Sequence, residues 1–92
     1  MPERTKRRNV VLSATKEVEL EPGVLLPAGF YDGVSNDVGV ETSDGVSWTP
    51  QTYLVELTGA QLATIGATAT NDLVSTEFDV TEHVRSGRIE VL

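Results

Sequence analysis

The residues of this chain that could do chemistry are few, and their spacing matches no familiar catalytic motif. His83 is the only histidine, so a metal site built from several histidines cannot form within one chain. It falls in a segment expected to be a short helix, where a surface or half-buried role is the simpler interpretation. Serines are plentiful, but none lies in a G-x-S-x-G motif. A nucleophile with its own general base is therefore not indicated.

Oxygen ligands for a cation are the next possibility. Asp32, Asn36 and Asp37 fall close together, but an EF-hand loop needs ligands at alternate positions and a terminal glutamate. Residues of this type also stabilise turns unaided, which is the interpretation we adopt. Neither G-x-x-x-x-G-K-[ST] nor G-x-G-x-x-G occurs. Without cysteine, the chain has no thiol nucleophile and no thiolate zinc site. We expect no enzyme, no metal, no cofactor and no small-molecule substrate.

The charges are laid out unevenly along the chain. Four cations stand among the first eight residues: Arg4, Lys6, Arg7 and Arg8. From position 9 onward three basic residues oppose thirteen acidic ones, a net charge of −10. We expect a disordered basic arm over 1–8, because this segment is charged, terminal and without apolar periodicity, and a single small β-rich domain over 9–92. The arm would bind an acidic partner or nucleic acid, while the acidic body would repel nucleic acid.

The secondary structure predicted for the first third of the chain consists of short strands. Val10, Leu12 and Ala14 share one face of a strand, opposite Val11, Ser13 and Thr15, and the alternation continues to position 21 with an interruption at Lys16. Pro22-Gly23 matches a type II turn, in which glycine supplies the positive φ. The sequence therefore predicts a strand region over 9–21 and a corner-rich segment over 22–33.

The middle of the chain predicts a hairpin. Asp44-Gly45 tolerates the positive φ of a type I′ turn between strands over 38–43 and 46–49. Residues 34–37 are expected to be a loop, and Pro50 is expected to end the returning strand. A further strand is predicted over 53–57 from the alternation of apolar residues there.

The second half predicts two short helices. Thr58 and Gln61 match a capping box for a helix over 59–65 that ends at Gly66, and Asp79 and Glu82 match a second box for a helix through Arg85. Residues 67–72 are expected to be a mobile loop. Residues 73–78 fit either a strand or a helix, and we favour a strand. A last strand is predicted over 88–92.

Together these patterns predict a mainly β fold, a small barrel or rolled antiparallel sheet, SH3-like or similar, with one or two short helices. No apolar run approaches the length of a membrane span or of a signal-peptide core, which favours a cytoplasmic protein.

The partner-binding residues that the sequence suggests are the basic arm and an aromatic group. Trp48 is the only tryptophan, a residue type that often anchors interfaces, and Tyr31 and Tyr53 are expected to flank it. The leading hypothesis is a non-catalytic interaction or assembly module that self-associates or docks on a larger protein through a sheet edge or the Trp48 face. The size and general sequence character of the chain are typical of small viral or mobile-element accessory or structural proteins. The alternatives are an acidic inhibitor that mimics nucleic acid and, least favoured, a small hydrolase-type enzyme.

Overall fold

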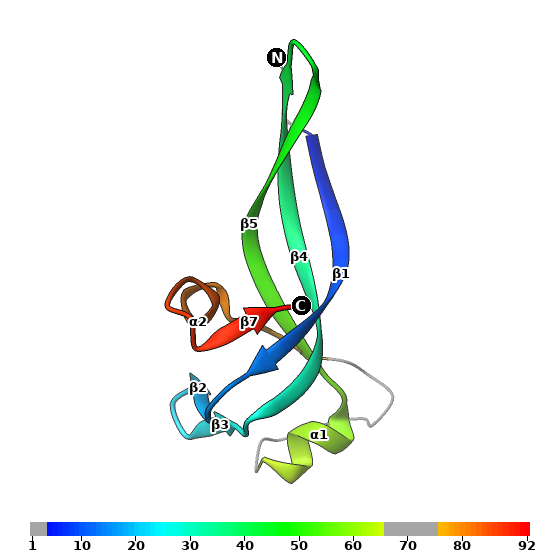
Figure 1. Ribbon diagram of the computed structural model, residues 1–92. Coiled ribbons are helices and arrows are strands. Elements are labelled where there is room, and N and C mark those ends of the chain that lie inside the picture. The colour runs from blue at the N-terminus through cyan, green and yellow to red at the C-terminus, as the bar shows by residue number, and fades with distance from the viewer. Residues whose placement is uncertain (1–3, 66–75) are drawn as a thin grey trace.

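The computed structural model describes residues 4–65 and 76–92, which form a mainly antiparallel β-protein with two short helices (Figure 1). The elements are β1 (Arg4–Ala14), β2 (Val18–Glu21), β3 (Val24–Leu26), β4 (Gly29–Thr42), β5 (Gly45–Leu57), α1 (Gly59–Thr64), β6 (Thr76–Asp79), α2 (Thr81–Arg85) and β7 (Ile89–Val91). Five strands form one sheet in the order β6-β5-β4-β1-β7, and β2 pairs with β3 in a separate hairpin. The expectation of a mainly β fold is confirmed.

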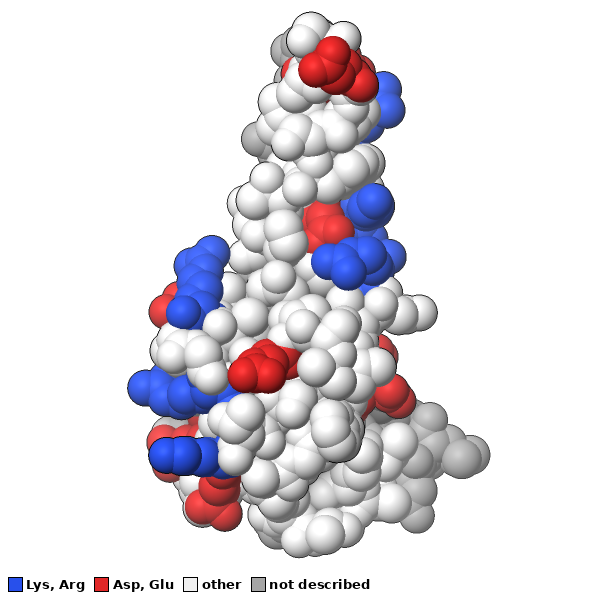
Figure 2. All heavy atoms as spheres, in the orientation of Figure 1, with Lys and Arg blue, Asp and Glu red and all other residues white. Residues whose placement is uncertain are grey.

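Three strands of the sheet extend far beyond the others. β6 pairs with β5 only over Leu54–Leu57, and β7 pairs with β1 only over Leu12–Ala14. The remaining length of β1, β4 and β5 projects as a ribbon, seen in Figure 2 as a narrow column above a broader base. The molecule consequently measures 49 × 27 × 21 Å. We call this ribbon the arm and define it as residues 4–9 and 36–52.

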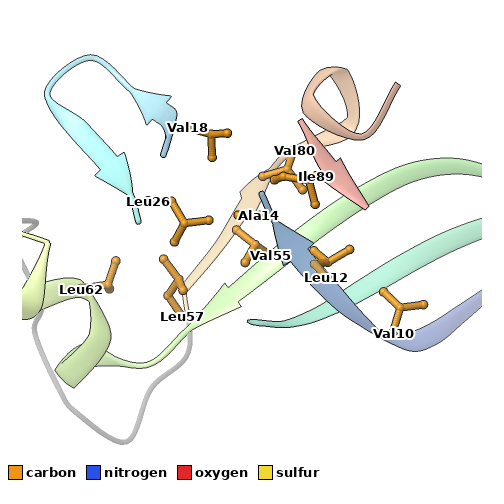
Figure 3. Close-up of a cluster of buried hydrophobic side chains, with 10 residues drawn as sticks. All are labelled: Val10, Leu12, Ala14, Val18, Leu26, Val55, Leu57, Leu62, Val80 and Ile89. Carbon is orange, nitrogen blue, oxygen red and sulfur yellow. The ribbon is translucent and has the colours of Figure 1, made fainter. Parts of the chain in front are cut away.

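The hydrophobic core lies on one face of the sheet, at the end opposite the tip of the arm (Figure 3). Its buried members are Val10, Leu12, Ala14, Val18, Leu26, Val55, Leu57, Leu62, Val80 and Ile89. Alternation along β1 and β5 directs every second side chain toward this face. The β2–β3 hairpin, α1 and the segment around α2 and β7 then cover it. Only the base of the molecule is therefore held together by apolar burial.

The predicted start of α1 is confirmed. The Thr58 hydroxyl accepts a hydrogen bond from the Gln61 amide at 3.2 Å, and the Gln61 side chain accepts one from the Thr58 amide at 2.8 Å. Leu57 and Leu62, on either side of this cap, are both buried in the core. The cap and the apolar contact thus fix the direction in which the chain leaves β5.

The second helix begins later than the sequence predicts. Asp79 ends β6, and α2 starts at Thr81 with Val80 as its N-cap residue. The Asp79 carboxylate still accepts hydrogen bonds from the Thr81 hydroxyl at 2.6 Å and from the Thr81 amide at 2.9 Å. These two bonds lower the pKa of Asp79. The Asp79 carboxylate therefore binds the first residue of α2 although Asp79 itself lies in β6, and Val80 between them is buried in the core.

The expectation of a barrel is not confirmed. Within residues 4–65 and 76–92, β6 and β7 lie at opposite edges of an open sheet and do not pair with each other. Twist alone does not close a sheet whose outer strands are this short, because each covers only three or four residues of its neighbour.

Three expectations about the hairpin were wrong. Residues 34–37 lie in the middle of β4, and Pro50 lies inside β5. Pro50 is tolerated because β5 is an edge strand at this point, so its missing N–H removes no hydrogen bond between strands. A β-bulge follows, at the Asn36–Asp37 step of β4. The turn itself is Ser43-Asp44, since Thr42 pairs with Gly45, so it lies one residue earlier than predicted.

Within the segment 1–8 that was expected to be disordered, residues 4–8 lie in β1, and residues 1–3 fall outside the described residues. Arg4 to Arg8 form the first half of β1 and pair in continuous register with β4. The strand pairing supplies the partner that a terminal segment needs to be ordered. The predicted strand over 9–21 is divided between β1 and β2, with the break around Lys16 as the sequence indicates. The Pro22-Gly23 turn is confirmed, with Gly23 at φ 83°.

The remaining expectations concern the second half of the chain. The loop predicted over 67–72 and the first part of the strand predicted over 73–78 lie outside the described residues. β6 and β7 confirm strands within 76–78 and 89–91. Neither α1 nor α2, the two helices in the described part of the chain, has the length and hydrophobicity that crossing a membrane requires.

Candidate interaction surface

The core face of the sheet continues onto the arm, where it carries Trp48. In the register of β4 with β5, Trp48 lies opposite Gly39, so the two share a face. A Cβ atom on Gly39 would come within 2.8 Å of both the Trp48 ring and a methyl group of Val46. Because Gly39 has no side chain, the indole ring of Trp48 has room to lie over β4 at this position. Lys6 lies on β1, on the other side of β4, and its ammonium group is 4.2 Å from the centroid of the Trp48 ring.

Asp37 is the buried charge of the arm. Its residue is only 3% exposed, on a ribbon that is otherwise open to solvent. The Ser35 hydroxyl donates to one carboxylate oxygen, and the Arg8 guanidinium donates to the other at 3.1 Å. The Ser35 hydrogen bond, the Arg8 guanidinium and the more distant Lys6 charge hold the pKa of Asp37 below its usual value, although burial acts the opposite way. Asp37 is therefore ionised and ties β1 to β4.

The other cations of the basic segment 1–8 also lie along β1. Arg4 pairs with Glu41 at 2.9 Å, and Arg7 pairs with Glu77 of β6. The cations form a row down one side of the arm in Figure 2. Their side chains remain 46–57% exposed. Exposed pairs of this kind contribute little to stability, so they can exchange partners at low cost.

The aromatic residues that the sequence suggested as one group are separated. Tyr53 lies opposite Ser35, four positions along β4 from the Trp48 partner Gly39, and Tyr31 lies opposite Leu12. Both tyrosines pack against the core cluster. The Tyr31 hydroxyl donates to the Pro27 carbonyl at 2.7 Å, and burial raises the pKa of this hydroxyl. Trp48 therefore belongs to the arm, and the two tyrosines belong to the base.

The arm has two strand edges that no described residue covers. On β5 the edge runs from Gly45 to Pro50, contains no charged residue, and is followed by the bulge, beyond which the Tyr53 backbone is bonded to Val80 and Thr81. On β1 the edge runs from Arg4 to Val10 without proline, glycine or a register shift. Of the two, the β1 edge is the regular one. This edge could not be predicted from the sequence, because residues 1–8 lack the apolar alternation by which strands are recognised.

A second feature that the sequence analysis missed lies on the face opposite the core. Phe30 is opposite Ser13, and Leu92 continues β7 with its amide bonded to the Val11 carbonyl. Val11, Phe30 and Leu92 thus share this back face and are 43%, 72% and 67% exposed. Strand alternation alone predicts that Phe30 and Tyr31 point to opposite faces of the sheet. The pairing of β7, β1 and β4 is what brings Val11, Phe30 and Leu92 together on the back face.

His83 has a structural contact. Its Nε2 lies 2.9 Å from the Glu19 carbonyl oxygen and so joins α2 to the β2–β3 hairpin. An open pocket of about 380 Å³ is lined in part by Asp79, Thr81 and His83. The Thr81 hydroxyl is already engaged by Asp79 and by the Tyr53 amide. In the part of the chain that the structure describes, no three His, Cys, Asp or Glu residues gather as metal ligands would.

Together, these features make the arm a surface suited to contact with another protein chain. The arm presents a half-exposed indole ring, a row of exposed cations and two strand edges, each of which is a means of recognising another chain. On the face shown in Figure 2 the acidic side chains form separate groups and no continuous band. No protein-family model, curated protein or solved structure matches this chain.

Proposed function

We propose that the protein is a non-catalytic interaction or assembly module that binds another protein chain through its arm. The observation that supports this most directly is the arm itself. It projects away from the hydrophobic core and contributes no residue to that cluster, whose nearest member along β1 is Val10. Folding of the base does not require so long a projection. Exposed strand edges favour association with other chains and are usually shortened or covered.

The side chains of the arm support a recognition role in a second way. Trp48 is held half-buried between Gly39 and Lys6, so its ring is fixed before any partner arrives. A fixed aromatic side chain loses little conformational entropy on binding, which is why tryptophan is frequent at interface centres. The Asp37 network orders the strands beneath it. The arm is in this sense preorganised.

The proposal is tested by site-specific photo-crosslinking in lysate of the source cell. A benzoylphenylalanine at Ser47, an exposed position on the arm, is compared with one at Ala60, an exposed position on α1. We expect Ser47 to crosslink to one defined protein chain, a partner or a second copy, and Ala60 to give none of that product. Light scattering on the purified protein separates the two sources. A strictly monomeric protein whose arm gives no more crosslinking than Ala60 contradicts the proposal.

A further inference from the structure

We propose that the outer edge of β1, from Arg4 to Val10, binds an extended acidic peptide segment of the partner, which adds to the sheet as a strand in line with β7. This inference rests on the proposed function and specifies the class of partner. It follows from the hydrogen-bonding pattern of the edge, from the charges on both sides of it, and from the comparison with the edge of β5.

The backbone groups of the β1 edge are arranged to accept a strand. The Leu92 amide donates to the Val11 carbonyl at 2.9 Å, and the Thr15 amide donates to the Arg88 carbonyl at 3.3 Å. Odd-numbered residues of β1 therefore direct their backbone groups toward β7. Because β1 pairs with β4 without a register shift, the same alternation reaches the arm. Thr5, Arg7 and Asn9 point their N–H and C=O groups away from β4, and no described residue pairs with them there.

β7 already sets the direction of the added strand. Ile89, Glu90 and Val91 pair antiparallel with Ala14, Ser13 and Leu12, so β7 runs toward the arm along this edge. A segment that occupied the next positions would continue the same ladder past Val10 toward Arg4. Each new residue would meet backbone groups in the geometry that β7 already uses.

The charges of the edge decide which segment fits. Arg4, Lys6 and Arg8 lie on the core face and Arg7 lies on the back face, so cations line both sides of the edge. A second copy pairing through the same edge would place arginine and lysine opposite one another, which is unfavourable. Acidic residues opposite these positions form favourable cross-strand pairs. The exposed ion pair of Arg4 with Glu41 can be replaced by such contacts without loss of a buried interaction.

The edge of β5 lacks these properties. Pro50 has no N–H to offer, and the bulge displaces the residues after it. Between Gly45 and Pro50 no charge is present to select a partner. Proline and bulges are devices by which proteins prevent pairing at an edge. The structure therefore blocks one edge of the arm and leaves the other regular and charged.

The experiment uses the full chain labelled with ¹⁵N and two synthetic peptides. The probe is acetyl-Glu-Val-Glu-Thr-Glu-Val-Glu-amide, and its matched control carries lysine in place of every glutamate. We expect the acidic peptide to shift the amide resonances of Thr5, Arg7 and Asn9 and to slow their hydrogen exchange at least tenfold at saturation. Binding should weaken as salt is raised, because the charges are exposed. The lysine peptide should have no effect on these amides.

Two variants at one position separate backbone pairing from charge. Arg7→Pro and Arg7→Gln both remove the guanidinium, but only proline removes the outward N–H, and proline is tolerated at strand edges. We expect Arg7→Pro to bind the acidic peptide at least tenfold more weakly than Arg7→Gln, with circular dichroism verifying that both fold. Equal binding by the two variants, equal binding of both peptides, or shifts confined to the outward amides of Val46 and Trp48 on β5 would each overturn the inference. If Ser47 still crosslinks to a partner while the acidic peptide leaves β1 unchanged, strand addition is wrong and the proposed function stands.

Discussion

The Lys6 ammonium lies 4.2 Å from the centroid of the Trp48 ring, and the two residues come from strands that are not neighbours. β4 runs between them, and at the crossing point it has Gly39, whose missing side chain leaves room for the indole. The contact therefore joins all three strands of the arm across their core face. It also gives the lone tryptophan and one cation of the basic segment a common structural role, which the sequence alone did not connect.

Replacing Lys6 by glutamine removes the cation and keeps a side chain of similar length. We expect Lys6→Gln to lower the free energy of unfolding by about 0.5–1 kcal/mol, the usual range for a partly exposed cation–π contact. Trp48 fluorescence should shift to longer wavelength and be quenched more readily by acrylamide. Urea unfolding measures the first effect. Lys16→Gln, at an exposed position between β1 and β2, is the control and should change stability by less than about 0.5 kcal/mol.

Two glycines of β4 should differ in their tolerance of alanine. The atoms nearest to a Cβ at Gly39 belong to the side chains of Trp48 and Val46, whereas a Cβ at Gly33 comes within 2.5 Å of a Leu12 methyl group and 2.8 Å of the Leu54 carbonyl oxygen. Overpacking typically costs about 1–3 kcal/mol. We expect Gly39→Ala at the low end of this range and Gly33→Ala at or above the high end, since a backbone atom cannot rotate away. Thermal unfolding of both variants gives the order, and the reverse order would show that the arm is the more rigidly packed part.

Acid should destabilise the arm through Asp37. Its pKa in the folded protein lies below the ordinary value of 3.8, chiefly because of the Ser35 hydrogen bond. Its ionised form therefore contributes stability that is fully present above pH 3.8 and is lost as the pH falls through the folded pKa. Asp37→Asn should lose about 1.5–3 kcal/mol at pH 7, the range for hydrogen bonds to charged groups. Urea unfolding at pH 7 and pH 2.5 should show a smaller gap between wild type and variant in acid.

The capping box of α1 predicts a loss of about 1 kcal/mol for Thr58→Ala, because the Gln61 amide would lose its acceptor. Thr58→Ser keeps the hydroxyl and is the matched control, expected to stay within about 0.5 kcal/mol of the wild type. Hydrogen exchange at the Gln61 amide should quicken in the alanine variant alone. Identical exchange in both variants would mean that packing of Leu62, and not the cap, holds the helix start.

Local chemistry explains which parts of the fold could be predicted. Thr58 and Gln61 act on each other three residues apart, and Pro22-Gly23 supplies its own turn geometry, so both features were predicted correctly from the sequence. Apolar alternation likewise placed Val10, Leu12 and Ala14 on one face of a strand, and all three lie in the core. The error at residues 34–37 has the opposite cause. Buried polar residues are unusual inside a strand, and here Ser35 donates to Asp37, whose charge is paired with Arg8 from a strand far away in sequence.

The strand-rich character, the capped helix, the turn at Gly23 and the division between basic and acidic segments can all be predicted without the fold, because each depends on residues within a few positions of one another. Tertiary structure alone decided that residues 4–8 form a strand, that Trp48 lies under Lys6 and apart from Tyr31 and Tyr53, and that one edge of the arm stays open. Each of these depends on pairing between strands distant in sequence, and the register of such pairing is set by side chains that meet only after the chain has folded.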